Sequence, residues 1–255
     1  MAYFGKSVPV ESFLDDISRE AEKSGFTVET LVEVADLPLL ALSRRGPAGA
    51  PSVYLSAGIH GDEPAGSLAL LELLETDLSE EVTWHICPML NPGGAKTNSR
   101  NSPANVDLNR DYLALTQPEV KAHAKWLGTC DEFTLSICLH EDWEANGFYL
   151  YELNPHPERS VASEIVRAVE PVCPVDHSER IDGHAARNGV IIPNKKDLQR
   201  DDWPEALYLF THHTGIGYTL ETPSGFPLRT RVEAHVAGCL AAVRALLAHK
   251  AEGID

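Results

Sequence analysis

The chain has 255 residues, of which 43% are hydrophobic and 23% are charged, and its formal net charge is −17. This composition is sufficient for a large buried core and excludes an intrinsically disordered chain. The strong negative charge argues against binding to nucleic acid or to an anionic membrane surface, because both need a basic face. It still allows an anionic small substrate, since local arginine side chains outweigh a distant charge that salt screens.

Neither targeting nor disulfide bonding is indicated by the sequence. The N-terminal stretch MAYFGKSVPVESFLDD lacks the charged-then-apolar order of a signal peptide, and no run approaches membrane-spanning length. The five cysteines are odd in number, scattered and free of CxxC spacing. We therefore expect a cytoplasmic protein whose thiols are reduced and lie mostly in the core.

The chain begins with a predicted helix and a predicted hairpin. Residues 10–24 carry apolar side chains at helical spacing, and Gly25 ends this pattern. Residues 26–34 and 37–43 are typical of two strands, and the sequence RRGPAGAP at residues 44–51 is typical of a loop.

Strands and helices alternate after residue 51. In chain order we expect a strand at 53–56, a helix at 67–75, strand 82–88, helix 119–127, strands 132–139 and 147–153, helix 157–169, strand 189–193, helix 204–212, strand 216–220 and helix 227–249. This alternation predicts one α/β domain with helices on both faces of a sheet. The long segment 91–117, rich in Asn, Gly, Pro and Ser, is predicted to be a functional loop.

A candidate metal site follows the strand at residues 53–56. His60 and Glu63 stand three residues apart on the turn that leaves this strand, just before Pro64. Imidazole nitrogen and carboxylate oxygen suit zinc, and a catalytic zinc keeps three protein ligands, so the pair predicts a third ligand elsewhere. The same turn is also explained by a helix N-terminus, where the acidic residues Asp62 and Glu63 favour the positive end of the helix dipole.

Two further polar residues end apolar strands. His140 follows the run at 132–139, and Glu221 follows the run at 216–220. In open α/β sheets functional residues gather at the carboxyl ends of strands, so we expect both near the first pair. A boundary histidine with ordinary hydrogen bonds, or a solvated carboxylate, is the alternative for each residue taken alone.

Five short motifs then occur in one order: HGDE at 60–63, NPGG at 91–94, VDLNR at 106–110, LHE at 139–141 and TLE at 219–221. On these motifs the chain resembles the zinc carboxypeptidase family, whose relatives include succinylglutamate desuccinylase and aspartoacylase. The matching residues span about two thirds of the chain, from 60 to 221. The resemblance implies a zinc carboxypeptidase-like fold over residues 1–255, with a mixed, twisted central sheet.

The resemblance also implies a role for each matching residue. One zinc ion per chain would be held by His60, Glu63 and His140, with Glu221 as general base. In the remaining roles, Asp107 accepts a hydrogen bond from a zinc-bound imidazole, Asn109 and Arg110 bind a substrate carboxylate, and Arg100 polarises the scissile carbonyl. Zinc lowers the pKa of a bound water to about 7, and a nearby carboxylate can take its proton, so the chemistry agrees.

Parts of the family pattern have no match. No motif identifies the mobile tyrosine of the digestive enzymes; Tyr149, Tyr208 and Tyr218 are candidates, although each also fits the core. Residues 173–202, where the family builds its specificity pocket, contain no residue that matches. For His184, His212 and His213, and for the acids Glu141, Asp142 and Glu144, solvated positions and positions in the cleft both stay open.

Three functions remain open. The first is a metallocarboxypeptidase that acts on peptides, including cell-wall peptides, and VDLNR and the chain length favour it. The second is a deacylase of N-acyl amino acids, which uses the same residues. The third is an inactive binding protein on the same fold, against which the intact Glu221 argues. The expected partner is a small substrate with a free carboxylate, and the oligomeric state stays undetermined.

Overall fold

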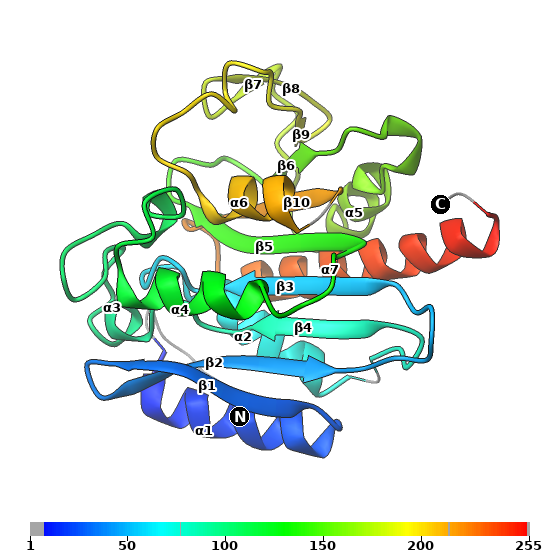
Figure 1. Ribbon diagram of the computed structural model, residues 1–255. Helices are drawn as coiled ribbons and strands as arrows, with labels where there is room; N and C mark the ends of the chain where they lie inside the picture. The colour runs from blue at the N-terminus through cyan, green and yellow to red at the C-terminus, as the bar shows by residue number, and fades with distance from the viewer. Residues whose placement is uncertain (1–7, 77, 214, 254–255) are drawn as a thin grey trace.

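One mixed sheet organises the protein in the computed structural model, which describes residues 8–76, 78–213 and 215–253. Its strands are β1 (Thr27–Val34), β2 (Leu37–Arg44), β3 (Ser52–Ala57), β4 (Thr83–Cys87), β5 (Leu135–Asp142), β6 (Tyr149–Leu153), β7 (Arg180–Ile181), β8 (His184–Arg187), β9 (Val190–Ile191) and β10 (Gly217–Pro223). Their spatial order is β1-β2-β4-β3-β5-β10-β6-β9-β8-β7 (Figure 1). The four neighbours β4, β3, β5 and β10 run parallel, so their carboxyl ends meet at one edge.

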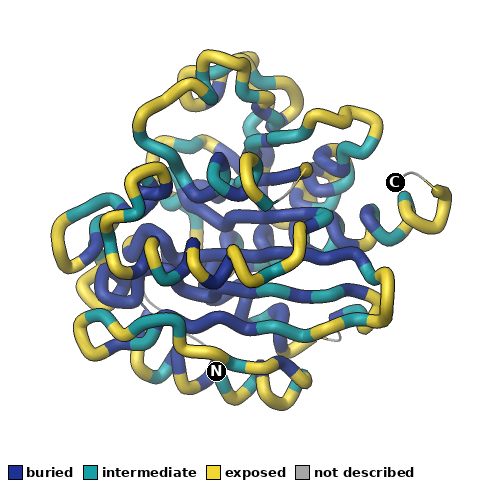
Figure 2. The backbone as a smooth tube through the Cα atoms, in the orientation of Figure 1, coloured by how far each residue is buried: buried dark blue, intermediate teal, exposed yellow. Residues whose placement is uncertain are grey.

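Helices cover both faces of the sheet (Figure 1). They are α1 (Val10–Lys23), α2 (Pro64–Leu74), α3 (Pro92–Lys96), α4 (Pro118–Leu127), α5 (Ala162–Val169), α6 (Glu205–His212) and α7 (Leu228–Ala251). Alternate residues of a strand point to opposite faces: Val53 and Leu55 pack with α1, α2, α5 and α7, whereas Tyr54 packs with α4 and α6. All six residues of β3 are buried, as expected for a central parallel strand, and Figure 2 shows the central strands as the most buried part.

The predicted fold class is confirmed: a mixed α/β sheet carries helices on both faces. The predicted helix at 157–169 is wrong at its start, where Pro157–Arg159 forms a separate 3₁₀ turn and Ser160 is extended. The hydroxyl of Tyr218 accepts the N–H of Val161 there, which provides a partner outside the helix. The expected loop 91–117 contains α3 and a 3₁₀ turn at Leu108–Arg110, and β7 and β8 had not been predicted.

His140 and Glu221 do not end their strands, contrary to expectation. Strand β5 continues to Asp142 and β10 continues to Pro223 because the parallel ladder between them extends through the pairs Thr222–Glu141 and Pro223–Asp142. Within this ladder Glu221 is the direct partner of His140. The two residues therefore lie side by side near the carboxyl edge.

Helix α7 corrects another expectation, since by length and composition it is long and apolar enough to cross a membrane. Half of its most apolar 18-residue stretch is buried inside the protein. The inner side chains Val232, Cys239 and Val243 belong to the core beside α2 and α5. This packing is typical of a core helix. All five cysteines are free thiols, and four of them are buried, as predicted.

Candidate active site

Two glycines shape the turn that carries His60 and Glu63 out of β3. Gly58 adopts φ +65°, a left-handed conformation that L residues rarely adopt. A Cβ atom on Gly61 would lie 2.1 Å from the carbonyl carbon of Gly94, so the NPGG turn packs directly on this backbone. Asn91 of the same motif is fully buried and donates from Nδ2 to the carbonyls of Ile59 and Arg100, both at 3.3 Å. The NPGG motif thus joins the two loops that carry His60 and Arg100.

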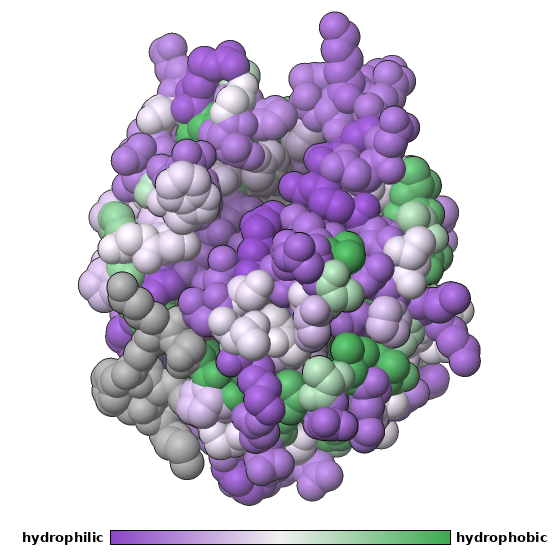
Figure 3. All heavy atoms as spheres, turned by 90° about the vertical axis from the view of Figure 1, so that its left-hand side faces the viewer, coloured by the Kyte–Doolittle hydropathy of each residue, from purple (hydrophilic) through white to green (hydrophobic). Residues whose placement is uncertain are grey.

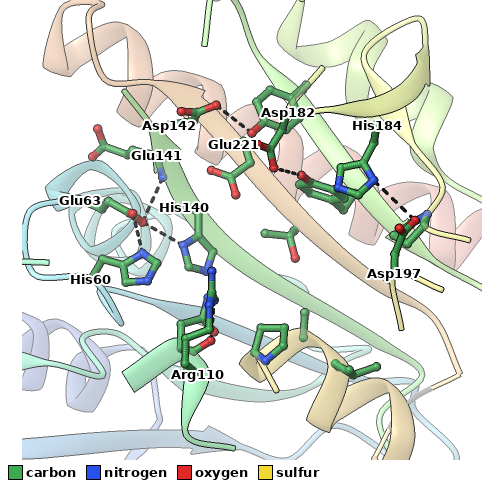
Figure 4. A pocket seen from close by; sticks show the side chains of 18 of the residues that line it. His60, Glu63, Arg110, His140, Glu141, Asp142, Asp182, His184, Asp197 and Glu221 are labelled. Carbon is green, nitrogen blue, oxygen red and sulfur yellow. Dashed lines mark hydrogen bonds and ion pairs between the residues drawn. The ribbon is translucent and has the colours of Figure 1, made fainter. Parts of the chain in front are cut away.

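Three buried side chains converge at the carboxyl edge of the sheet. Nδ1 of His60 lies 2.6 Å from Oε1 of Glu63, and Nδ1 of His140 lies 2.9 Å from Oε2 of the same carboxylate (Figure 4). One donor atom of each residue lies within 4.8 Å of the others, and all three residues are buried. The structure therefore brings together the three residues that the sequence analysis expects to bind zinc.

The charges of this cluster depend on one another. Burial works against ionisation of Glu63, but the adjacent His140 and His60 outweigh it and hold the pKa of this carboxyl well below its ordinary value. Burial also disfavours the charged forms of the two imidazoles, yet Glu63 raises the pKa of both. A cation bound between these groups would compete with protons for the two imidazoles.

Asp107 and Arg100 stand beside His60. Oδ1 of Asp107 lies 3.3 Å from Nε2 of His60, the position that the sequence analysis assigns to it. Its Oδ2 accepts from Nε and Nη2 of Arg100 at 3.1 and 3.0 Å. Nη1 of Arg100 lies 3.6 Å from Oε1 of Glu63, so the guanidinium is next to the cluster, as expected for a group that stabilises an oxyanion there.

Glu221 faces the same pocket from β10 (Figure 4). Its carboxylate has no hydrogen bond or ion pair with the described residues. Burial raises the pKa of Glu221 to about 8, with smaller contributions from Glu63, Asp142 and Asp182 in the same direction and an opposing one from His140. A half-buried carboxyl with a raised pKa and no fixed partner among the described residues is suited to proton transfer.

Both residues of the expected carboxylate-binding pair, Asn109 and Arg110, line the pocket. The amide oxygen of Asn109 also accepts the N–H of Glu205 at 2.8 Å, so this atom fixes the start of α6. Arg110 lines the pocket, donates to the carbonyl of Asn109 at 2.7 Å and lies 3.4 Å from Asp202. Its side chain remains 39% exposed, so the guanidinium is accessible, although a substrate has to compete with Asp202.

One pocket of about 710 Å³ is lined by His60, Glu63, Arg100, Asn109, Arg110, His140 and Glu221. Figure 3 shows that the face bearing the carboxyl edge is largely hydrophilic and hollowed. Segment 180–202 contributes seven residues to the wall, of which the sequence analysis considers only His184: Asp182, His184, Pro193, Asp197, Leu198, Arg200 and Asp202. Asp182 lies in the turn between β7 and β8, and His184 begins β8, but such two- to four-residue strands leave no periodic signal.

Some of the tyrosines and histidines whose roles the sequence leaves open line the pocket, and others do not. Among the tyrosines, Tyr149 lines the pocket and donates to Asp142 at 2.9 Å, while the hydroxyl of Tyr218 donates to Glu152 and Tyr208 packs on Tyr112. His184 lines the pocket 3.5 Å from Asp197. His212 and His213 pack around Tyr208, outside the residues that line the pocket.

The residues present fit a zinc ion. Two imidazole nitrogens and one carboxylate are a ligand set that catalytic zinc uses with a position left open for water or substrate. Both Nδ1 atoms face the same carboxylate, and Asp107 meets the distal nitrogen of one ring. In zinc sites a carboxylate typically accepts a hydrogen bond from the ring nitrogen that does not bind the metal, as Asp107 is placed to do for His60.

Comparison with known proteins gives relatives of two kinds. Carboxypeptidase SOL1 of Arabidopsis thaliana is 38% identical over 112 residues, which are 35% of this chain and 23% of that protein. Murein peptide amidase A of Escherichia coli K12 is 21% identical over 179 residues, 70% of this chain and 66% of that protein. The chain thus covers about a quarter of the first relative and about two thirds of the second.

Solved structures share the fold. A Shewanella amazonensis SB2B protein assigned as a metallopeptidase superposes with a TM-score of 0.83 at 24% identity, over 96% of this chain and 99% of that chain. A metallo-carboxypeptidase from Burkholderia cenocepacia gives 0.71 at 18% identity, over 94% and 70%. The family model of the succinylglutamate desuccinylase/aspartoacylase catalytic domain matches residues 49–179, just over half of the sequence. The predicted resemblance is thereby confirmed, and the chain belongs to the succinylglutamate desuccinylase/aspartoacylase catalytic-domain family.

Proposed function

We propose that the protein is a zinc-dependent hydrolase that cleaves an amide bond next to a free carboxylate, and that its substrates are peptides. The observation that carries this proposal is the position of Glu221. Its unpaired carboxylate adjoins His140 on the neighbouring strand and faces the pocket that also exposes the His60–Glu63–His140 cluster. A metal ligand set and a free base in one pocket are the two groups that amide hydrolysis requires.

His60, Glu63 and His140 would hold the zinc ion. When bound, zinc polarises the scissile carbonyl and acidifies the attacking water. Glu221 takes the proton of this water as it attacks and later returns it to the leaving amine. The guanidinium of Arg100, fixed by Asp107 beside the cluster, donates to the oxygen on which negative charge develops.

The substrate carboxylate is assigned to Arg110. Its guanidinium lines the same pocket and offers a charge-assisted hydrogen bond that anchors the substrate beside the cluster. Asn109 lines the same pocket beside Arg110 and is assigned to the same carboxylate, while its amide oxygen holds the start of α6 against this loop. Binding at Arg110 would place the scissile amide between the anchor and the zinc ligands.

A deacylase is the second candidate, because the family model is named after two enzymes of that kind. The pocket charge favours peptides over acyl groups that carry a second carboxylate. Asp142 and Asp182 line the pocket, and within the described part of the chain neither forms an ion pair; their side-chain partners are the hydroxyls of Tyr149 and Tyr151. A second carboxylate on the substrate would be repelled there. The name of murein peptide amidase A adds cell-wall peptides as candidate substrates.

A mass-spectrometric screen tests the proposal. The zinc-loaded protein is incubated with peptides, cell-wall peptide fragments and N-acyl amino acids, in parallel with chelator-treated protein and with the Glu221→Gln variant. We expect cleavage of peptides that carry a free carboxylate, by the zinc-loaded protein alone. Cleavage confined to N-acyl amino acids would favour the deacylase, and cleavage by all three samples would exclude the proposed centre.

A further inference from the structure

Directly behind the zinc cluster lies a buried ion pair that has no role in the proposed reaction. Nη1 of Arg231, in the first turn of α7, donates to Oε2 of Glu141 on β5. Glu141 and Arg231 are only 5% and 7% exposed. The guanidinium is also fixed by its Nε, which donates to the carbonyl of Phe226 at 3.0 Å. Removing both charges from water costs free energy, so we looked for a function that this buried pair serves.

Glu141 contacts the segment of the zinc ligand Glu63 in two ways. Its backbone N–H donates to Oε2 of Glu63 at 3.1 Å. Its side-chain Oε1 accepts the N–H of Ala65, two residues after Glu63, at 2.7 Å. One residue therefore holds both the carboxylate of Glu63 and the backbone from which this carboxylate extends. Figure 4 shows Glu141 on the opposite side of Glu63 from His60.

We propose that Glu141 and Arg231 are positioning residues for Glu63, and that through them the affinity for zinc depends on the docking of helix α7. The inference rests on the proposed zinc site but concerns metal binding, not hydrolysis. Without Arg231, the buried Glu141 carboxylate lacks its cation and turns toward other partners. This movement loosens the hydrogen bond to Ala65 and the orientation of Glu63.

A second ion pair provides a matched control. Arg229, two residues before Arg231 on α7, pairs with Glu72 of α2 at 2.8 Å. This pair also joins α7 to α2, but the side chain of Arg229 is 62% exposed and forms no hydrogen bond or ion pair with Glu63 or Ala65. If only the attachment of α7 to α2 mattered, both arginines would have similar effects on the metal.

The test is zinc affinity, measured by competition with a chromogenic chelator for the full chain and its variants. Glu141→Gln and Arg231→Gln should each weaken zinc binding by about 10- to 100-fold, as losses of outer-shell partners do. Arg229→Gln should change it less than twofold. The double variant Glu141→Gln/Arg231→Gln should bind zinc no more weakly than the weaker-binding single variant, because both changes break the same ion pair.

Thermal unfolding separates positioning from general destabilisation. A merely structural pair would lower Tm equally with and without zinc, whereas a positioning pair reduces the rise in Tm that zinc produces. Unchanged zinc affinity in the folded Glu141→Gln and Arg231→Gln variants would overturn the inference and leave the hydrolase proposal intact. If the unaltered protein binds no zinc, both fail; if the variants lose affinity while no substrate is found, only the proposed function fails.

Discussion

Oδ1 of Asp107 lies 3.3 Å from Nε2 of His60, on the side of the imidazole opposite Glu63. A carboxylate only accepts hydrogen bonds, so this contact keeps the proton on Nε2 and turns Nδ1 toward the cluster. The pKa of Asp107 falls well below its ordinary value: burial opposes this shift, but the hydrogen bond from His60 and its charge prevail. The residue therefore stays ionised and fixes the tautomer of a candidate zinc ligand.

Removing the charge of Asp107 should weaken zinc binding. Asp107→Asn keeps an oxygen for the N–H of Asn109, which Oδ1 accepts at 2.9 Å, but no longer secures the tautomer of His60. We expect an affinity loss of about 10- to 100-fold in chelator competition. Asp202→Asn is the control, because Asp202 lines the same pocket but its partners are Arg110 and Arg200. Equal losses in both variants would contradict the role of Asp107.

Zinc binding should release protons at pH 7. Glu63 raises the pKa of His60 and His140 against the effect of burial, so both rings carry more proton at this pH than free histidines do. Two unperturbed histidines of pKa about 6.5 would release roughly 0.5 proton together at pH 7. Affinity should rise with pH and level off above the raised pKa values, because protons compete with zinc only below them.

Calorimetry in buffers of different ionisation enthalpy counts these protons. The Glu221→Gln background is used, since burial raises the pKa of Glu221 to about 8 and its proton would otherwise add to the total. We expect more than roughly 0.5 proton released per zinc ion in this background. A smaller number, or an affinity that does not change between pH 5 and 7, would exclude the two imidazoles as ligands.

Glu221→Gln should abolish turnover without loss of metal. Glutamine keeps the size of the side chain but cannot accept the proton of the attacking water. We expect kcat to fall by about 10²- to 10⁴-fold on any substrate that the screen identifies, with zinc content unchanged. Glu144→Gln is the control, because this exposed acid lines the same pocket and its effect should be small. Near-normal turnover of Glu221→Gln would show that Glu221 is not the base.

The substrate carboxylate and Arg110 should behave as one interaction. Amidating the carboxylate, or the change Arg110→Ala, should each cost roughly 2–5 kcal/mol in transition-state binding, about a thirty-fold to several-thousand-fold loss in kcat/KM. Combining the two should add little further loss, because both delete the same contact. Equal cleavage of acid and amide by the unaltered protein would rule out Arg110 as the anchor.

Asp202 provides a second test of Arg110 as the group that binds the substrate carboxylate. It lies 3.4 Å from Nε of Arg110 and thus competes with a substrate carboxylate for the guanidinium. Asp202→Asn should therefore lower KM for acid substrates and leave kcat nearly unchanged. Steady-state kinetics on an acid substrate and its amide decide this, since the amide should gain nothing.

Long elements and local motifs were predictable from the sequence. The hairpin β1–β2, the buried run of β3 and the helix spacing of α1 appear as expected, because periodicity and glycine breaks act locally. The cluster was predictable through HGDE, which contains His60 and Glu63, and through LHE, which contains His140. The pairing of Glu221 with His140 needed the strand order, which brings residues 81 positions apart into one register.

Contacts among distant single residues were not predictable. Arg231 is one of several charged residues of α7 and Glu141 lies in a short acidic run, and only the packing of α7 shows that they form a pair. Asn109 lines the pocket, but the hydrogen bond of its amide oxygen with the N–H of Glu205 at the start of α6 was not predictable. The pocket wall from residues 180–202 depends on two-residue strands and turns, whose placement comes from tertiary contacts.

The central claim is that one zinc ion binds between His60, Glu63 and His140. An anomalous difference map from crystals of the zinc-loaded protein, recorded on both sides of the zinc absorption edge, tests it most directly. We predict a single strong peak about 2.0–2.2 Å from Nδ1 of His60, from Nδ1 of His140 and from a carboxylate oxygen of Glu63. A map with no peak at this point, or with the ion bound by other side chains, would contradict the account.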